Sequence, residues 1–151
     1  MTSSSGENEA ISEHGAFVDP KYRLMTFKDW IYDSDPAALC TSKKLAEAGF
    51  ISAVTPDDPY AASCAFCLKT LEWEAHDEPE QEHKSHCPKC LFVTMMLGDA
   101  PKELTVEDSI RLIFYRYGNV NCAVFRELHK RGELFEANIR DQLEKLTKNL
   151  Q

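Results

Sequence analysis

The residues with the clearest chemical potential are six cysteines, at positions 40, 64, 67, 87, 90 and 122. Four of them form two Cys-x-x-Cys pairs, and two histidines stand just before the second pair. Thiolates and imidazoles are ligands that zinc prefers, and a structural zinc site uses four of them in a tetrahedron. The spacing therefore indicates a structural zinc site within the segment 64–90.

Two ligand sets fit this spacing. One is a four-thiolate set of Cys64, Cys67, Cys87 and Cys90. The other replaces Cys87 with His83, and spacing alone leaves both sets open. A redox role for a Cys-x-x-Cys pair is the alternative, but two pairs and two histidines within 27 positions favour metal binding.

Composition and charge narrow the class of protein. The chain has 151 residues, 43% of them hydrophobic and 28% charged, as expected for one domain or one small domain with an extension. Its net charge of −8 repels phosphate backbones, so we expect no direct nucleic-acid partner. The polar first residues lack the apolar core of a signal peptide, and no run reaches the roughly 18 apolar residues of a membrane span. We therefore expect no membrane association and an intracellular protein with reduced thiols.

The elements that must position the ligands are short. Apolar residues at positions 24, 27 and 30 predict a short amphipathic helix over 22–30. Thr41 is a suitable N-cap for a second helix, which Gly49 would end. The segments 63–67 and 68–73 are typical of two short strands that bend around the first Cys-x-x-Cys pair, and a further strand starts at residue 50.

Two more short helices are expected around the second half of the ligand segment. Asp77 or Glu78 can cap a helix that opens with Pro79 at its first position, and this helix would carry the histidines. A further short helix follows Pro88 and would carry Cys90.

The last third of the chain is predicted to be a long helical stretch. Thr105 and Asp108 resemble the two ends of a capping box. Apolar residues then recur at spacings of three and four, and the stripe ends with Phe135, Ile139, Leu143, Leu146 and Leu150. A lone helix cannot bury such a stripe, so we expect it to pack on a partner or to fold back on its own domain. We divide the chain into a flexible tail (1–16), a zinc domain (17–98) and a helical extension for partner binding (99–151).

Charge is unevenly distributed along the sequence. Residues 57–87 hold eight acidic residues and two lysines, which gives a net charge of −6. This acidity coincides with the expected zinc module. It favours a cationic ligand there, such as the amino terminus of a peptide or a basic tail.

Several motifs follow one another in a fixed order between residues 20 and 97. They are the segments 23–30 (RLMTFKDW), 46–50 (AEAGF), 64–67 (CAFC) and 71–74 (LEWE), then Glu78-Pro79, His83 and Cys90. Together they resemble the baculovirus inhibitor-of-apoptosis repeat, the BIR domain. One repeat followed directly by a helical tail resembles the survivin-like branch, the single-BIR subunits of the chromosomal passenger complex. The resemblance implies an α+β fold: a small zinc-stapled domain of short helices around a three-stranded antiparallel sheet, followed by a long C-terminal helical extension.

The resemblance also implies the ligand set. In the BIR family one zinc ion is held by two cysteines, a histidine and a last cysteine, and these map onto Cys64, Cys67, His83 and Cys90. Cys87 then becomes a spare thiol beside the site. Such a site is closed, so we expect no catalysis at the metal and no enzymatic activity.

A peptide-binding groove is implied in the same way. In this family Glu72 and Asp77 would hold a peptide's terminal ammonium, and Trp73 would wall a pocket for its first side chain. The passenger-complex branch reads a histone tail phosphorylated on its third residue, a threonine, and Lys69 and His86 occupy the positions beside the phosphate. The alternatives are solvated strand faces for Lys69 and Glu72, a core aromatic for Trp73, and a plain surface helix position for His86.

The implied partners are other chains of the complex. The tail would form a helix bundle with inner-centromere-protein-like and borealin-like helices, and would reach an Aurora-type kinase indirectly. The implied locations are the nucleus, the chromosome and centromere, the spindle midzone, and the cytoplasm in interphase. The alternative function is a caspase-binding inhibitor of apoptosis. A RING-type ubiquitin ligase would need further Cys/His ligands that the sequence lacks.

Overall fold

The computed structural model describes residues 14–98 and 103–148, except for the side chains of residues 146 and 147. It divides into two compact units, Met1–Asn119 and Val120–Gln151, which are taken in turn below. The division of the chain into segments 1–16, 17–98 and 99–151 stays a prediction.

The N-terminal unit begins with short helices joined by turns. Helix α2 (Pro20–Met25) has Pro20 in its first turn and the carboxylate of Asp19 as its cap. A 3-10 helix, η1 (Ile31–Ser34), and helix α3 (Ser42–Glu47) follow. The helix predicted over 22–30 is wrong in its extent, because the backbone of Asp29 adopts a left-handed conformation (φ 53°) that no helix continues through. Trp30 instead lies in the core and donates from its indole nitrogen to the carbonyl of Cys40 at 2.9 Å.

The predicted caps of α3 are confirmed. The hydroxyl of Thr41 accepts a hydrogen bond from the backbone N–H of Lys44 at 3.3 Å. Gly49 ends the helical segment at φ 95°, a conformation that other residues adopt only with strain. A Cβ atom at this position would lie 2.7 Å from Cε1 of Phe92, so close packing also requires glycine.

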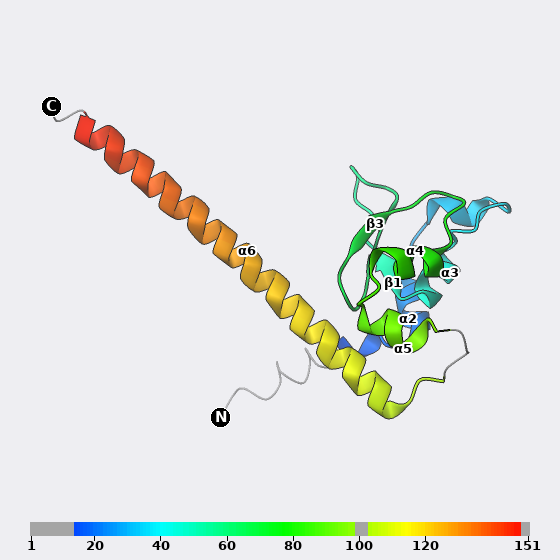
Figure 1. Ribbon diagram of the computed structural model, residues 1–151. Coiled ribbons are helices and arrows are strands. Elements are labelled where there is room, and N and C mark those ends of the chain that lie inside the picture. Colours follow the sequence, from blue (N-terminus) through cyan, green and yellow to red (C-terminus); the bar gives the residue numbers. More distant parts are fainter. Residues whose placement is uncertain (1–13, 99–102, 149–151) are drawn as a thin grey trace, which may run out of the picture. The chain divides into compact units, whose positions relative to one another are not determined.

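A small antiparallel sheet forms the centre of the unit (Figure 1). Its strands are β1 (Phe50–Ser52), β2 (Ala61–Cys64) and β3 (Thr70–Glu72), in the order β1-β2-β3. Phe50 pairs with Cys64, and Ser63 pairs with Thr70. This register places the first ligand cysteine at the end of the central strand.

Helices α4 (Pro79–His86) and α5 (Leu91–Met96) follow the sheet. Pro79 opens α4, as predicted, and Cys90 is the residue just before α5 rather than part of it. The core that these elements enclose is rich in aromatic side chains; Phe50, Phe66, Phe92, Trp30 and Trp73 are each no more than 4% exposed. The expected fold class is therefore confirmed for this unit.

Helix α6 (Val106–Lys148) supplies the last part of the N-terminal unit. It starts at the predicted capping box, in which Thr105 and Asp108 each donate a backbone N–H to the other's side chain. Leu112 is only 1% exposed and joins the core cluster. The first turns of the helix are thus packed as part of the zinc domain.

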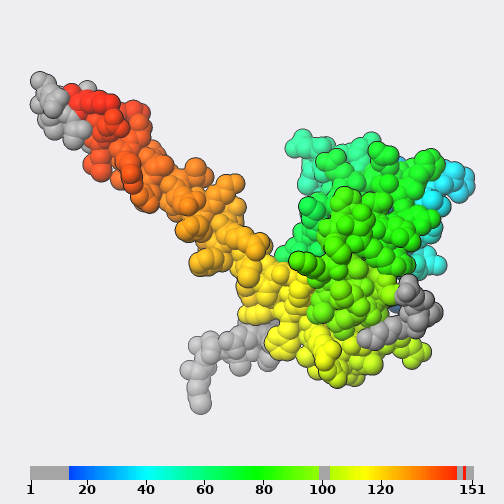
Figure 2. All heavy atoms as spheres, viewed as in Figure 1, coloured from blue at the N-terminus to red at the C-terminus, as the bar shows by residue number. Residues whose placement is uncertain are grey.

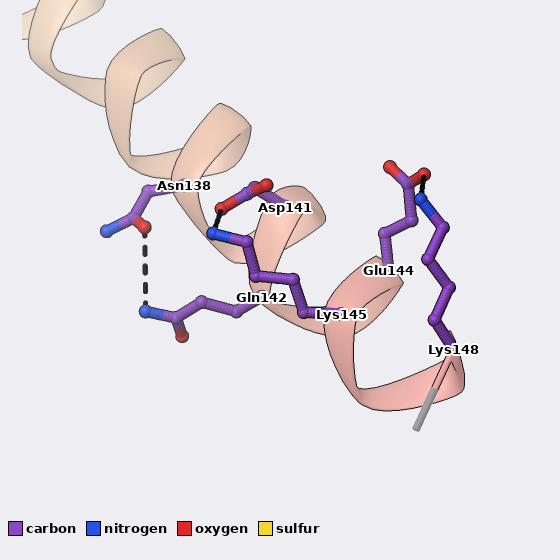
Figure 3. Close-up of polar contacts among 6 residues, drawn as sticks. All are labelled: Asn138, Asp141, Gln142, Glu144, Lys145 and Lys148. Atoms are coloured by element: carbon purple, nitrogen blue, oxygen red, sulfur yellow. Dashed lines mark hydrogen bonds and ion pairs between the residues drawn. The ribbon is translucent and has the colours of Figure 1, made fainter. Parts of the chain in front are cut away.

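The second unit is the remainder of α6, which continues without a break to Lys148. Its surface carries ion pairs between residues four apart, including Arg140 with Glu136 and Lys145 with Asp141. Figure 3 shows this pattern near the end of the helix, where Lys145 and Lys148 reach back toward carboxylates one turn earlier. Such pairs each add only a few tenths of a kcal/mol, roughly 0.2–0.5, to an exposed helix. Over the described residues, no helix combines the length and the apolar character needed to cross a bilayer.

Candidate metal centre and peptide-binding surface

The first ligand pair lies on a tight turn at the end of β2. Cys64 is fully buried, and its sulfur accepts hydrogen bonds from the backbone N–H groups of Phe66 and Cys67, both at 3.4 Å. Leu68 follows with φ 63°, which lets the chain turn back toward β3. Backbone N–H donors stabilise a thiolate, so this turn prepares Cys64 to bind a cation.

The histidine comes from the buried face of α4. His83 is fully buried, and its Nδ1 lies 2.8 Å from the carbonyl oxygen of Ala48. That contact fixes Nδ1 as the donor and leaves Nε2 as the atom available to a metal. Nε2 is buried and has no hydrogen-bond partner among the described residues, which is the environment expected of a metal ligand.

The four ligand atoms meet at one point. The sulfurs of Cys64, Cys67 and Cys90 and a ring nitrogen of His83 all lie within 4.8 Å of one another. The sulfurs of Cys64 and Cys90 are 3.9 Å apart. Tetrahedral coordination with Zn–S bonds of about 2.3 Å places two sulfurs roughly 3.8 Å apart. The cluster therefore fits one structural zinc ion, held by three thiolates and one imidazole.

The geometry selects between the two ligand sets that spacing leaves open. Cys87 is not a member of the four-atom cluster, although it is close in sequence to Cys90. Burial, together with the nearby Cys67 thiolate, raises the pKa of the Cys87 thiol to about 12. Because its sulfur lies outside the four-atom cluster, Cys87 is the spare thiol that the family resemblance implies.

Electrostatics within the cluster depend on the three sulfurs. Burial by itself would lower the pKa of His83, but the facing sulfurs of Cys67 and Cys90 outweigh it and raise that pKa to about 9. The pKa of Cys67 is held far below its usual range by hydrogen bonding with Cys64 and Cys90, the largest contributions. Burial has the opposite effect on Cys64 and raises its pKa. The four ligands thus share protons that a zinc ion must displace.

An apolar shell and a buried cation surround the ligands. The ring of Phe50 lies 4.6 Å from that of His83, and the rings of Phe66 and Phe92 stack at 4.9 Å. The guanidinium of Arg23 lies over both stacked rings and donates to the carbonyls of Phe17, Val18 and Ala46. Burial lowers the pKa of Arg23 to about 10, which still leaves it charged at neutral pH. This shell buries Cys64, His83 and Cys90, whereas Cys67 is half-buried, so the cluster has the character of a structural centre.

Two residues of α6 that sequence analysis missed contact the metal-binding turn. Arg116 donates to the carbonyl of Ala65, and Asn119 donates to the carbonyl of Phe66 at 2.9 Å. Both carbonyls lie between the two cysteines of the first pair. The sequence signal that could have identified these two residues is the helical spacing of three and four, because positions 116 and 119 share a helix face with the buried Leu112.

The residues predicted to bind a peptide fall into two groups. Lys69 and His86 line one shallow hollow beside the metal ligands. Glu72 and Asp77 lie on β3 and on the turn after it, and Asp77 accepts a hydrogen bond from the N–H of Glu74 at 2.7 Å. Trp73 is 2% exposed and packs edge-on against Phe50, so it lies beneath the surface of the sheet rather than on it.

The predicted stripe of the helical extension is exposed in the second unit. Phe135, Ile139 and Leu143 are 68%, 40% and 58% exposed. The side chain of Leu146 and the whole of Leu150 lie outside the described residues. Earlier turns of the same unit add Val124, Phe125 and Leu128 to the exposed apolar side chains. Figure 2 shows the side chains of this segment, orange to red, along the helix.

Comparison with known proteins finds one matching family model and several similar proteins. The family model described as "Inhibitor of Apoptosis domain" (BIR) matches residues 23–94. Mouse "Baculoviral IAP repeat-containing protein 5" is 40% identical over 116 residues, which cover 76% of this chain and 78% of the mouse protein. "Baculoviral IAP repeat-containing protein 5.2" of Xenopus tropicalis is 37% identical over 128 residues, which cover 82% of this chain and 78% of the frog protein. "Chromosomal passenger complex protein bir-1" of Caenorhabditis elegans is 42% identical over 102 residues, which cover 67% of this chain and 62% of the nematode protein.

We predict that zinc affinity increases with pH across the neutral range. Because the pKa of His83 is raised to about 9, the metal must displace its proton at any lower pH, and that proton alone gives roughly a tenfold change per pH unit. Competition with a chelator of known affinity at about pH 6, 7 and 8 measures the slope. The control His76→Ala should behave as wild type, and His83→Ala should lose tight binding. A flat profile over this range would contradict the assigned ligand.

Proposed function

Because the chain belongs to the BIR, or inhibitor-of-apoptosis repeat, family, we propose that it is a non-enzymatic adaptor of the chromosomal passenger complex. The observation that carries the proposal is its similarity to the passenger complex protein bir-1 over 102 residues. A closed Cys3His centre, with no open position for substrate or water, supports binding rather than catalysis. As such an adaptor the chain would act at chromosomes and centromeres and at the spindle midzone, and would lie in the cytoplasm in interphase.

We propose that one ligand is a histone tail that begins with alanine and carries a phosphothreonine as its third residue. Glu72 and Asp77 offer carboxylates for the terminal ammonium, in the part of the chain with a net charge of −6. Trp73, just beneath the surface, would form the floor of the pocket for the first side chain. Lys69 and His86 share one hollow, which supports their pairing around a phosphate.

We propose that the second part of α6 binds helices. Six of its apolar side chains are between 40% and 71% exposed: Val124, Phe125, Leu128, Phe135, Ile139 and Leu143. Inner-centromere-protein-like and borealin-like helices are the proposed partners, and an Aurora-type kinase would be reached through them. Ion pairs elsewhere on the helix, such as that of Arg140 with Glu136, leave the apolar stripe available for a bundle.

Calorimetric titration with the phosphorylated tail peptide tests the groove. Asp77→Asn keeps an acceptor for the N–H of Glu74 but removes the charge that would hold the ammonium. We expect about tenfold weaker binding in this variant, since hydrogen bonds to charged groups contribute roughly 1.5–3 kcal/mol. Asp58→Asn, in the loop before β2, is the matched control and should bind as wild type. Equal affinities of the two variants, or no binding by the wild-type chain, would remove the groove assignment.

A single charged residue introduced into the apolar stripe tests whether the second part of α6 binds partner helices. Phe135→Glu should abolish association with inner-centromere-protein-like and borealin-like helices in size-exclusion chromatography, because it places a carboxylate in an apolar interface. Ala137→Glu introduces the same group two residues further on, outside the stripe, and should leave the complex intact. If Phe135→Glu instead lowers the melting temperature of the isolated chain and Ala137→Glu does not, the stripe packs within the chain itself.

A further inference from the structure

The hollow that holds Lys69 and His86 is lined by six further residues: Cys67, Cys87, Pro88, Lys89, Cys90 and Tyr115. Cys67 and Cys90 are assigned zinc ligands, and Lys89 and Tyr115 add an ammonium group and a phenol. Lys89 belongs to the turn between Cys87 and Cys90, and Tyr115 comes from α6. No carboxylate is among the described residues that line this hollow, in a chain whose net charge is −8. The local excess of cations is therefore a specific feature of this surface rather than a reflection of composition.

The two lysines that line the hollow lie on turns next to assigned zinc ligands. Lys69 is two residues after Cys67, and its carbonyl accepts a hydrogen bond from the N–H of Cys64 at 2.9 Å. Lys89 is directly before Cys90, whose N–H donates to the carbonyl of Cys87 at 2.9 Å. Each lysine thus lies on a short turn that is anchored at a zinc ligand. Neither backbone position can move far without disturbing the cluster.

We propose that Lys89 and Tyr115 complete a site for a phosphate dianion, which makes the hollow selective for a phosphorylated side chain over a carboxylate. This inference rests on the proposed binding of a phosphorylated peptide and names the residues that set its selectivity. A phosphate carries about −1.5 to −2 charges at neutral pH and three acceptor oxygens, so it uses more donors than a carboxylate can. Two ammonium groups, an imidazole and a phenol O–H supply donors of the required kind.

The surrounding charges are consistent with this assignment. His86 Nε2 lies 3.3 Å from a carboxylate oxygen of Glu82 one turn earlier on α4. Three thiolates on one zinc ion leave the nearby metal centre with a charge of about −1. A single lysine would be largely offset by that charge, whereas two lysines leave a net attraction for a dianion.

Tyr115 connects the hollow with the first part of α6. It lies on the same helix segment as Arg116 and Asn119, which bind the carbonyls of the metal-binding turn. Those contacts hold the helix, and with it the phenol, beside the ligands. A peptide phosphate in the hollow would therefore touch four segments of the domain: the β2–β3 turn, the end of α4, the turn before α5, and α6.

Titration of paired ligands into matched variants tests the proposal. The ligands are the tail peptide with phosphothreonine at its third residue, the same peptide with glutamate there, and free O-phosphothreonine. Lys89→Gln should weaken the phosphopeptide about tenfold and leave the glutamate peptide nearly unchanged. Tyr115→Phe should weaken the phosphopeptide severalfold. Lys84→Gln, on α4 outside the hollow, is the control and should match the wild type, and thermal melts verify that each variant is folded.

The outcomes separate this inference from the proposed function. If Lys89→Gln binds the phosphopeptide as tightly as the wild type, while Asp77→Asn still loses it, the peptide groove stands and the role of Lys89 is wrong. If the wild type binds O-phosphothreonine with the same dependence on Lys89 but binds no tail peptide, the phosphate site stands and the histone-tail ligand is wrong. If neither ligand binds, both are wrong.

Discussion

The structure depends on the convergence of three sulfurs and one imidazole that come from three separate turns of the chain. The first pair lies at the end of β2, the histidine on α4, and the last cysteine before α5, and their ligand atoms lie within 4.8 Å of one another. A sheet of three strands with three or four residues each encloses too little surface to hold these turns together alone. Zinc binding in small domains contributes apparent free energies of about 10–16 kcal/mol, which is enough to determine whether the domain folds.

Within the N-terminal unit, the hollow proposed to bind phosphate lies beside this centre. The turn between Cys64 and Cys67 is held from outside by Arg116 and Asn119, so the start of α6 is part of the zinc domain rather than a separate tail. The aromatic rings of Phe50, Phe66 and Phe92 pack around the cluster, and Phe50 belongs to β1, so these rings connect the cluster with the sheet. The ligand cluster, the sheet and the first turns of α6 are thereby linked by direct contacts within the N-terminal unit.

Local chemistry made much of this architecture predictable from sequence. Caps and glycines identify helix ends because they act within a few residues, as Thr41, Gly49 and the Thr105–Asp108 box illustrate. Spacing identified a zinc site but left Cys87 and His83 as competing ligands. The fold distinguishes them, because the imidazole of His83 joins the four-atom cluster and Cys87 does not. The contact of His83 with the carbonyl of Ala48, which is 35 residues away, orients that imidazole. Arg116 and Asn119 could not be assigned from sequence for the same reason, since their partners are the distant carbonyl groups of Ala65 and Phe66. Trp30 was misplaced because nothing in the sequence indicates the left-handed turn at Asp29.

The account is tested most directly by measuring the metal content and the metal dependence of the fold in one preparation. Elemental analysis of the purified full-length chain should give one zinc ion per chain. Removal of that ion with a strong chelator should abolish the near-ultraviolet circular dichroism of the buried aromatic core and should leave helical signal from α6. A chain that contains no stoichiometric zinc, or one whose aromatic signal is unchanged after the metal is removed, would contradict the central role given to the cluster.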